Sequence, residues 1–202
     1  MAVVETEQHG EIFVIRMNRP DALNALNNEI RGLLSEAWNH FEDSKEMEVA
    51  IFTGSGRGFC AGEDMKEALA AGKPGFSKPT AKPDPFMRET LTKPVIGAIN
   101  GFAMGGVMLV EKTDLRLAVK GTLFEMSEAK RWMLGGWNHG HVANLPFPIA
   151  MEMAFAFRIT SERMYELGFV NRLVEADDLM PEAMKMAEHL LTLPPAARVN
   201  TL

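Results

Sequence analysis

The sequence contains a single cysteine, Cys60, among its 202 residues. One cysteine excludes an internal disulfide framework and fits a reducing compartment, so we expect a cytoplasmic protein. Cys60 could act as a nucleophile, but a reactive thiol needs an electropositive setting, and no histidine is near it in the sequence. We therefore predict that Cys60 is a small packing residue.

Long apolar runs and an excess of positive charge are also absent. We expect no membrane span and no N-terminal signal, because the apolar stretches are short. The formal net charge of −6 argues against nucleic acid as a partner. An anionic ligand would instead need a local basic patch. The candidates for such a patch, most of which we interpret as solvated surface charges, are Arg19, Arg57, Lys66, Lys73, Lys78 and Lys82.

Two glycine-rich segments are the most informative features present, namely residues 55–64 (SGRGFCAGED) and 100–106 (NGFAMGG). Each follows a β-like run and leads into a helix-like stretch. Backbone amides at a helix N-terminus are unpaired, and glycine lets a ligand approach the backbone closely. Two such amides converging on one carbonyl oxygen would form an oxyanion hole. The alternative is that both segments are simply tight turns with close packing.

The periodicity of apolar residues predicts strands alternating with helices in an α/β fold. The expected strands are residues 11–17, 49–53, 94–100, 115–119, 123–126 and 169–174. The expected helices are one capped by Asn27 or Asn28, then 63–71, 105–112, 148–158, one capped by Ser161, and 179–193. Residues 72–85 contain four prolines and two glycines, which predicts a mobile loop.

The sequence resembles the crotonase superfamily, the enoyl-CoA hydratase/isomerase family, over nearly its whole length. The resemblance lies in both glycine-rich segments with their flanks (57–66 and 93–106), in the opening run 17–26 (MNRPDALNAL) and in 159–174. It implies a spiral of repeated ββα turns in residues 1–145 and a helical region in 146–202 that makes subunit contacts. It also implies a homo-oligomer, either a trimer or a dimer of trimers. Family members usually continue with further helices past the position of Leu202, so we expect this chain to be shortened at its C-terminus relative to the family.

The resemblance also implies the site. The oxyanion donors carry over to the backbone N–H groups of Glu63 and Gly106, and coenzyme A is part of the substrate, so no separate cofactor and no metal are expected. We predict that Asp64 caps the helix that follows it. The residues expected to bind the acyl-CoA are Ala22, Leu23, Ala25, Ala61, Gly62, Asp64, Met65, Lys66, Gly105, Met108, Leu109, Arg131 and His139.

Glu128 is the predicted acid/base, because it stands at one of two positions where hydratases of this family carry a catalytic glutamate. The alternative is a surface glutamate in a Ser-Glu turn. At the other position the sequence has Met108 or Leu109 instead of glutamate. Glu111 is the nearest carboxylate, and on a helix it would point to another side.

Residues after Glu128 also depart from the family pattern: where the family usually has a glycine-rich turn ending in Gly-Gly-Thr-Gln-Arg, this chain has residues 132–141 (WMLGGWNHGH), which include His139 and His141. They could be a metal half-site, although no third ligand has suitable spacing. They could instead bind substrate or move protons, or they could be surface residues. Arg131 and Trp132 are expected to shape the acyl pocket or to pack under it.

These features predict an enzyme that stabilises an acyl-CoA enolate in an oxyanion hole and moves protons with one glutamate. Isomerisation of a double bond suits a single glutamate. Hydration helped by Asn138, His139 or His141 stays open, as does a lyase or dehydratase reaction. The rival interpretation is a catalytically weak or inactive acyl-CoA-binding subunit. A redox or metal protein built on Cys60 and the histidines is a third alternative.

Overall fold

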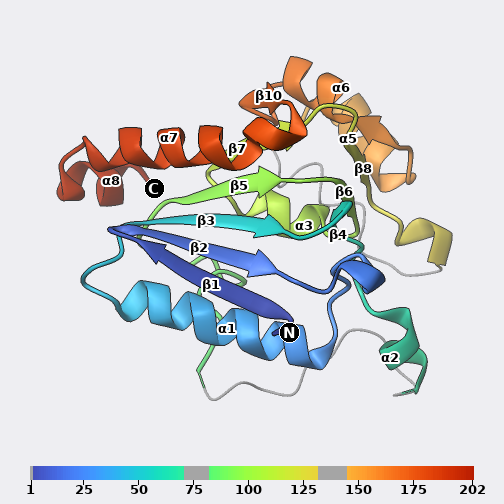
Figure 1. The fold of residues 1–202 in the computed structure, drawn as a ribbon. Coiled ribbons are helices and arrows are strands. Elements are labelled where there is room, and N and C mark those ends of the chain that lie inside the picture. Colours follow the sequence, from blue (N-terminus) through green and yellow to red (C-terminus); the bar gives the residue numbers. More distant parts are fainter. Residues whose placement is uncertain (1, 71–81, 132–144) are drawn as a thin grey trace.

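The strands form two sheets. The computed structural model describes residues 2–70, 82–131 and 145–202. The large sheet has the order β1-β2-β3-β5-β7-β10 and the small sheet has the order β4-β6-β8-β9 (Figure 1). The strands of the large sheet are β1 (Val4–His9), β2 (Ile12–Met17), β3 (Val49–Gly54), β5 (Val95–Ile99), β7 (Leu115–Val119) and β10 (Arg172–Val174). Those of the small sheet are β4 (Gly58–Cys60), β6 (Phe102–Met104), β8 (Leu123–Glu125) and β9 (Ile159–Thr160).

Helices flank these sheets and connect their strands. The α-helices are α1 (Asn28–Asp43), α2 (Met65–Ala70), α3 (Val107–Glu111), α5 (Phe147–Ala154), α6 (Ser161–Glu166), α7 (Leu179–Leu191) and α8 (Pro195–Thr201). Short 3₁₀ helices are η1 (Pro20–Ala22), η2 (Ala129–Arg131) and η4 (Ala176–Asp178). In the described part of the chain, no helix has the length and apolar character needed to cross a bilayer.

The chain winds as a spiral of ββα turns, as the resemblance predicts. A strand of the large sheet is followed by a strand of the small sheet and then by a helix in β3-β4-α2, in β5-β6-α3 and in β7-β8-η2. Successive turns stack in parallel in both sheets, because β3 pairs with β5 and β5 with β7, while β4 pairs with β6 and β6 with β8. This stacking brings segments more than forty residues apart in the sequence to the same edge of the small sheet.

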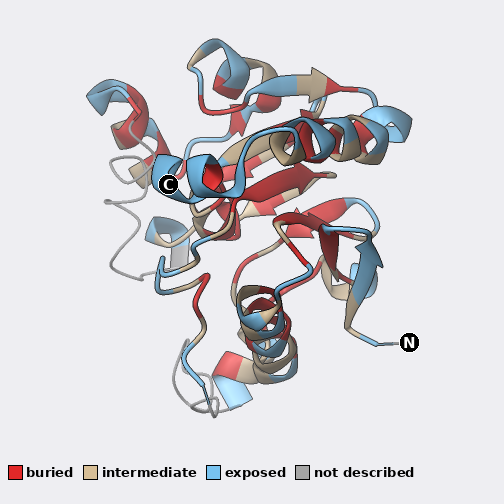
Figure 2. Ribbon diagram, turned by 90° about the vertical axis from the view of Figure 1, so that its left-hand side faces the viewer, coloured by how far each residue is buried: buried red, intermediate tan, exposed pale blue. Residues whose placement is uncertain are grey.

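Two apolar cores cover the two faces of the large sheet. Along β2, Phe13 and Ile15 join the core under α1, whereas Ile12 and Val14 join the core under α7. This alternation is the period of a strand buried on both faces. Figure 1 shows α1 and α7 on opposite faces of the sheet, and Figure 2 shows the buried residues concentrated along its strands.

Most of the predicted elements are confirmed, with ends that coincide or differ by up to four residues. One prediction was wrong: the cap of α6 is Thr160, whose side chain accepts a hydrogen bond from the N–H of Arg163, and Ser161 is already helical. The pattern did not reveal β1, β4, β6, β9 or α8. Pro195 begins α8, because proline fits the first turn of a helix.

Candidate functional site

The two glycine-rich segments lie in contact. The parallel pairing of β4 with β6 places their C-terminal ends side by side. A Cβ at position 62 would lie 3.0 Å from the carbonyl oxygen of Met104 and 3.1 Å from the Cα of Gly105. Gly62 and Gly105 also have φ values of +90° and +56°. Glycine is therefore required at both positions, by contact and by conformation.

A loop before α1 fixes the first glycine segment. Buried Asn24 donates hydrogen bonds to the carbonyl oxygens of Ser55 (3.0 Å) and Gly58 (2.8 Å), and its Oδ1 accepts one from the N–H of Arg19 (2.8 Å). The N–H of Ala61 donates to the carbonyl oxygen of Leu23 at 2.9 Å. Leu23 and Ala61, which the sequence places about forty residues apart, are thus brought together as the resemblance implies.

The amide of Glu63 points away from its neighbouring strand. Leu26 and Glu63 form a parallel β-bridge, in which the N–H of Leu26 donates to Gly62 (2.7 Å) and the N–H of Asp64 donates to Leu26 (3.1 Å). Since the flanking residues make both bonds of such a bridge, the N–H of Glu63 faces the other side. It donates to no residue in the described part of the chain. This amide is available to an external acceptor.

The amide of Gly106 is engaged within its own turn, where it donates to the carbonyl oxygen of Met104. Gly106 precedes α3 with a φ of −66°. A Cβ at this position would lie only 2.5 Å from the Cβ of Cys60, so the backbone of the second segment packs directly on the first. The two amides that the sequence predicts as oxyanion donors therefore sit on touching backbones, one available and one internally bonded.

Glu128 lies beside this contact. Its Oε1 is 3.9 Å from the position that a Cβ on Gly105 would take, and its Oε2 is buried without a hydrogen-bond partner among the described residues. A buried carboxylate oxygen without a partner is costly, and in native proteins it calls for a specific explanation. Glu128 as a whole is half-buried, and its Oε2 is the part that is shielded. Glu128, Gly105 and Gly62 are brought together by the stacking of three turns of the spiral.

Cys60 and Asp64 have the structural roles that the sequence predicts. Cys60 is fully buried behind the turns, and burial raises the pKa of its thiol to about 12, which removes it as a nucleophile. The Oδ1 of Asp64 accepts from the N–H groups of Lys66 (3.0 Å) and Glu67 (3.3 Å) at the start of α2. A hydrogen bond from Arg19, at 2.5 Å, lowers the pKa of Asp64 and keeps its carboxylate charged.

A cleft of about 290 Å³ borders the turns and is lined by Leu23, Ala61, Phe102, Met104, Leu123 and Arg158. Its lining is apolar except for Arg158, whose Nε donates to the buried carboxylate of Glu125 at 2.7 Å. Leu23 and Ala61 were predicted, but the other four were not. Phe102 and Met104 alternate along β6, and β8 brings Leu123 beside them, so a strand pattern in these short runs was the signal available.

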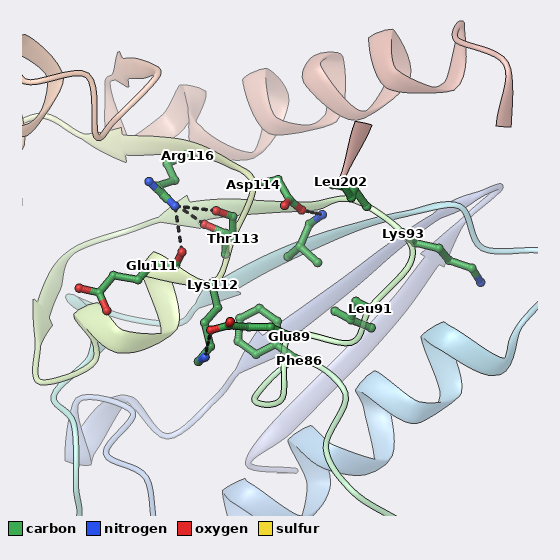
Figure 3. A pocket seen from close by; sticks show the side chains of 11 residues that line it. Phe86, Glu89, Leu91, Lys93, Glu111, Lys112, Thr113, Asp114, Arg116 and Leu202 are labelled. Carbon is green, nitrogen blue, oxygen red and sulfur yellow. Dashed lines mark hydrogen bonds and ion pairs between the residues drawn. The ribbon is translucent and has the colours of Figure 1, made fainter. Parts of the chain in front are cut away.

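A larger cavity of about 590 Å³ lies elsewhere, and none of the predicted site residues lines it (Figure 3). Its charged groups serve the fold. Arg116 donates to the carbonyl oxygens of Val110, Glu111 and Thr113 at the end of α3, and Asp114 accepts from the N–H of Val95. The smaller cleft, by contrast, is lined by Ala61 and Met104 from the two glycine-rich segments.

The position of the missing glutamate is apolar in the structure as well. Leu109 is buried in the core, and Met108 packs against the same core. Glu111 lines the larger cavity, so it belongs to another side of α3, as predicted. Glu128 is thus a carboxylate from the third turn of the spiral that lies beside the contact between the two glycine turns.

The remaining predicted residues are placed in part. Ala25 is buried and Ala22 half-buried in the loop beside the first glycine segment, and Met65 and Lys66 begin α2 with Lys66 exposed. Trp132, Asn138, His139 and His141, along with Lys73 and Lys78, lie outside the described residues, and of Arg131 only the backbone is described. Lys82 forms an exposed ion pair with Asp43 at 2.6 Å.

Comparison with known proteins gives a consistent set of matches. The family model for enoyl-CoA hydratase/isomerase matches residues 7–201. The enoyl-CoA hydratase EchA19 of Mycobacterium tuberculosis is 32% identical, over 98% of this chain and 80% of its own. The 1,2-epoxyphenylacetyl-CoA isomerase of Escherichia coli is 29% identical, over 91% of this chain and 74% of its own. A crystal structure of an enoyl-CoA hydratase from M. tuberculosis matches with a TM-score of 0.89 at 33% identity, covering 100% of this chain and 80% of that chain.

Proposed function

The chain belongs to the enoyl-CoA hydratase/isomerase family, and from that premise we propose that it transfers protons on an acyl-CoA thioester with Glu128 as its acid/base. The family establishes an enzyme of the hydratase/isomerase type that acts on acyl-CoA. The single observation that carries this proposal is the buried Oε2 of Glu128, which has no hydrogen-bond partner among the described residues, on a side chain that lies beside two touching glycine turns.

In this mechanism the thioester oxygen accepts hydrogen bonds from the N–H groups of Glu63 and Gly106. The Gly106 amide would share or exchange its bond to Met104 when the substrate enters. Fixed donors aimed at developing negative charge are usually the largest catalytic contribution, on the order of 3 kcal/mol for one donor. Glu128 would accept the leaving proton, because its Oε1 and the Cα of Gly62 both lie on the side of Gly105 where a Cβ would stand.

A double-bond shift needs one carboxylate. Glu128 would take a proton from C2 of a 3-enoyl thioester, and the electron pair would spread over C2 to C4 and the carbonyl oxygen. The protonated Glu128 would then return the proton at C4, leaving a 2-enoyl thioester and the enzyme unchanged. Hydration needs a group that activates water and another that places a proton on C2, and positions 108 and 109 supply no carboxylate. We therefore favour isomerisation or related proton transfer over fast hydration.

The assembly is part of the proposal. We expect a trimer or a dimer of trimers, because the family resemblance implies one and because apolar side chains are exposed around α5. Phe155 and Phe157 both lie on the surface of the single chain. Exposed aromatic clusters of this kind are typical of subunit contacts.

The test of the reaction is the wild-type protein assayed with crotonyl-CoA and with a 3-enoyl-CoA side by side. We expect turnover of the 3-enoyl-CoA to exceed hydration of crotonyl-CoA. Hydration of crotonyl-CoA at about 10³ per second, a rate typical of good enzymes, would contradict the single-carboxylate mechanism. Absence of turnover on either substrate, with coenzyme A still bound, would favour the rival interpretation, a binding subunit without catalytic activity.

A further inference from the structure

Glu63, whose amide donates to no residue in the ranges 2–70, 82–131 and 145–202, also carries a negative charge on its side chain. Glu63 has a carboxylate only a side chain's length from its own N–H, where the proposed mechanism develops an oxyanion. In the structure this carboxylate is turned to α1, and its Oε2 accepts from Arg31 Nη2 at 2.5 Å. Both side chains are about four-fifths buried, with 21% of Arg31 and 19% of Glu63 exposed.

We propose that Arg31 is a positioning residue that acts through Glu63, by neutralising and holding away a carboxylate that would otherwise oppose the oxyanion. This inference rests on the proposed oxyanion site. Two like charges a few ångströms apart repel, and in a partly buried setting that repulsion is screened less than at the surface. A paired carboxylate presents almost no net charge to the developing anion.

The backbone at Glu63 is already fixed without this ion pair. The bridge to Leu26 holds both neighbours of Glu63, and Asp64 is tied separately to Arg19 and to the start of α2. Glu67 also accepts from the N–H of Asn28 at 2.8 Å. The direction of the Glu63 amide therefore does not depend on Arg31, and the contribution left to Arg31 is electrostatic.

The surroundings support this assignment. Glu63, Asp64 and Glu67 place three carboxylates within one turn of chain beside the site, and each is held by a donor from the segment 19–31. Glu63 is the residue among them whose own amide the proposed mechanism uses as an oxyanion donor. An ordinary surface ion pair would be worth little, but this pair is shielded and adjacent to the reacting atoms.

The experiment compares Arg31→Met, Glu63→Gln, the double variant and Arg31→Lys. The first readout is the fraction of bound acetoacetyl-CoA present as enolate, measured by its ultraviolet absorbance, because this reports oxyanion stabilisation without turnover. The others are kcat on the 3-enoyl-CoA, coenzyme A affinity by calorimetry, and thermal unfolding. Arg172→Met, which removes an exposed ion pair with Glu182, is the matched control.

We expect Arg31→Met to lower the enolate equilibrium and kcat about tenfold, because it uncovers the charge of Glu63 at a cost of roughly 1.4 kcal/mol. Glu63→Gln should keep a larger enolate fraction than Arg31→Met, because it removes the carboxylate charge instead of uncovering it. In the double variant, the enolate fraction and kcat should recover to within about threefold of wild type. Arg31→Lys should recover most of the loss that Arg31→Met causes. Coenzyme A affinity should change by less than about threefold in all of these variants.

Recovery of activity in the double variant distinguishes an electrostatic role of Arg31 from a purely structural one. That variant still lacks the ion pair, so a purely structural role predicts that its activity and enolate fraction stay as low as those of Arg31→Met. This result, or an Arg31→Met protein equal to wild type, would overturn the inference. A wild-type protein that binds coenzyme A but forms no enolate would instead overturn the oxyanion site, and this inference with it.

Discussion

Glycine is required at positions 62, 105 and 106 for two different reasons, backbone conformation and lack of space for a Cβ. Gly62 and Gly105 need positive φ values, whereas Gly106 has an ordinary helical φ of −66°. What position 106 lacks is space, since a Cβ there would lie 2.5 Å from the Cβ and 2.6 Å from the carbonyl oxygen of Cys60. The closeness of the two backbones therefore depends on Gly106 and on the small, inert Cys60 behind it.

We predict that Gly106→Ala lowers the free energy of unfolding by about 1–3 kcal/mol, because an overpacked contact forces the two turns apart. It should also reduce turnover, since the amide moves with the turn. The matched control is Gly32→Ala in α1, where a Cβ would meet nothing within 4 Å. That change should stabilise the protein by about 0.5–1 kcal/mol, because alanine favours the helix. Urea unfolding of both variants measures this, and equal stabilities would contradict the packing argument.

For single residues, roles that depend on neighbouring residues in the sequence could be predicted, whereas contacts between residues far apart in the sequence could not. The Asp64 cap and the inert Cys60 follow from neighbouring residues. The ion pair of Glu63 with Arg31 joins residues 32 positions apart, and the bond from the Gly106 amide to Met104 depends on the conformation of one turn. Neither has a signal in composition or periodicity. The buried Oε2 of Glu128 likewise depends on how three turns of the spiral stack.

Elements were predictable where their periodicity ran long enough. The sixteen residues of α1 repeat apolar positions at helical spacing, and Asn27 caps the helix by accepting from the N–H of Ile30 at 2.9 Å. The strands β4, β6 and β9 have three residues or fewer, and an alternation as short as that of Phe102 and Met104 does not identify a strand by itself. Yet β4 and β6 are the strands that bring the glycine turns together, and only their pairing explains the site.

We predict that Asn27→Ala lowers the free energy of unfolding by about 1 kcal/mol, because the first turn of α1 loses its side-chain acceptor. Asn27→Asp should retain the stability, since aspartate caps equally well. Because α1 also carries Arg31, loosening its first turn should lower turnover slightly. Thermal unfolding of both variants provides the measurement. Equal losses for alanine and aspartate would mean that the amide group of Asn27, rather than its oxygen, matters.

In the molecule as a whole, the stacked ββα turns form the two sheets and the two apolar cores. The oligomeric state stays a prediction. We expect sedimentation to give a trimer or a dimer of trimers. Phe155→Ser with Phe157→Ser should shift the protein to smaller species, because these exposed rings lie next to α5. The control is Tyr165→Ser, which removes another exposed ring, on α6. A wild-type species with the mass of one chain at all concentrations would contradict this expectation.

Glu128→Gln tests whether this one carboxylate performs the proton transfer. Glu111→Gln is the matched control, because Glu111 lines the other cavity. Both variants are assayed on whichever of the two enoyl-CoA substrates the wild type turns over, with coenzyme A affinity measured alongside. We predict that Glu128→Gln loses about 10²- to 10⁴-fold in kcat while coenzyme A binding stays within about threefold and Glu111→Gln behaves as wild type. A Glu128→Gln protein with turnover within about threefold of wild type would contradict the account.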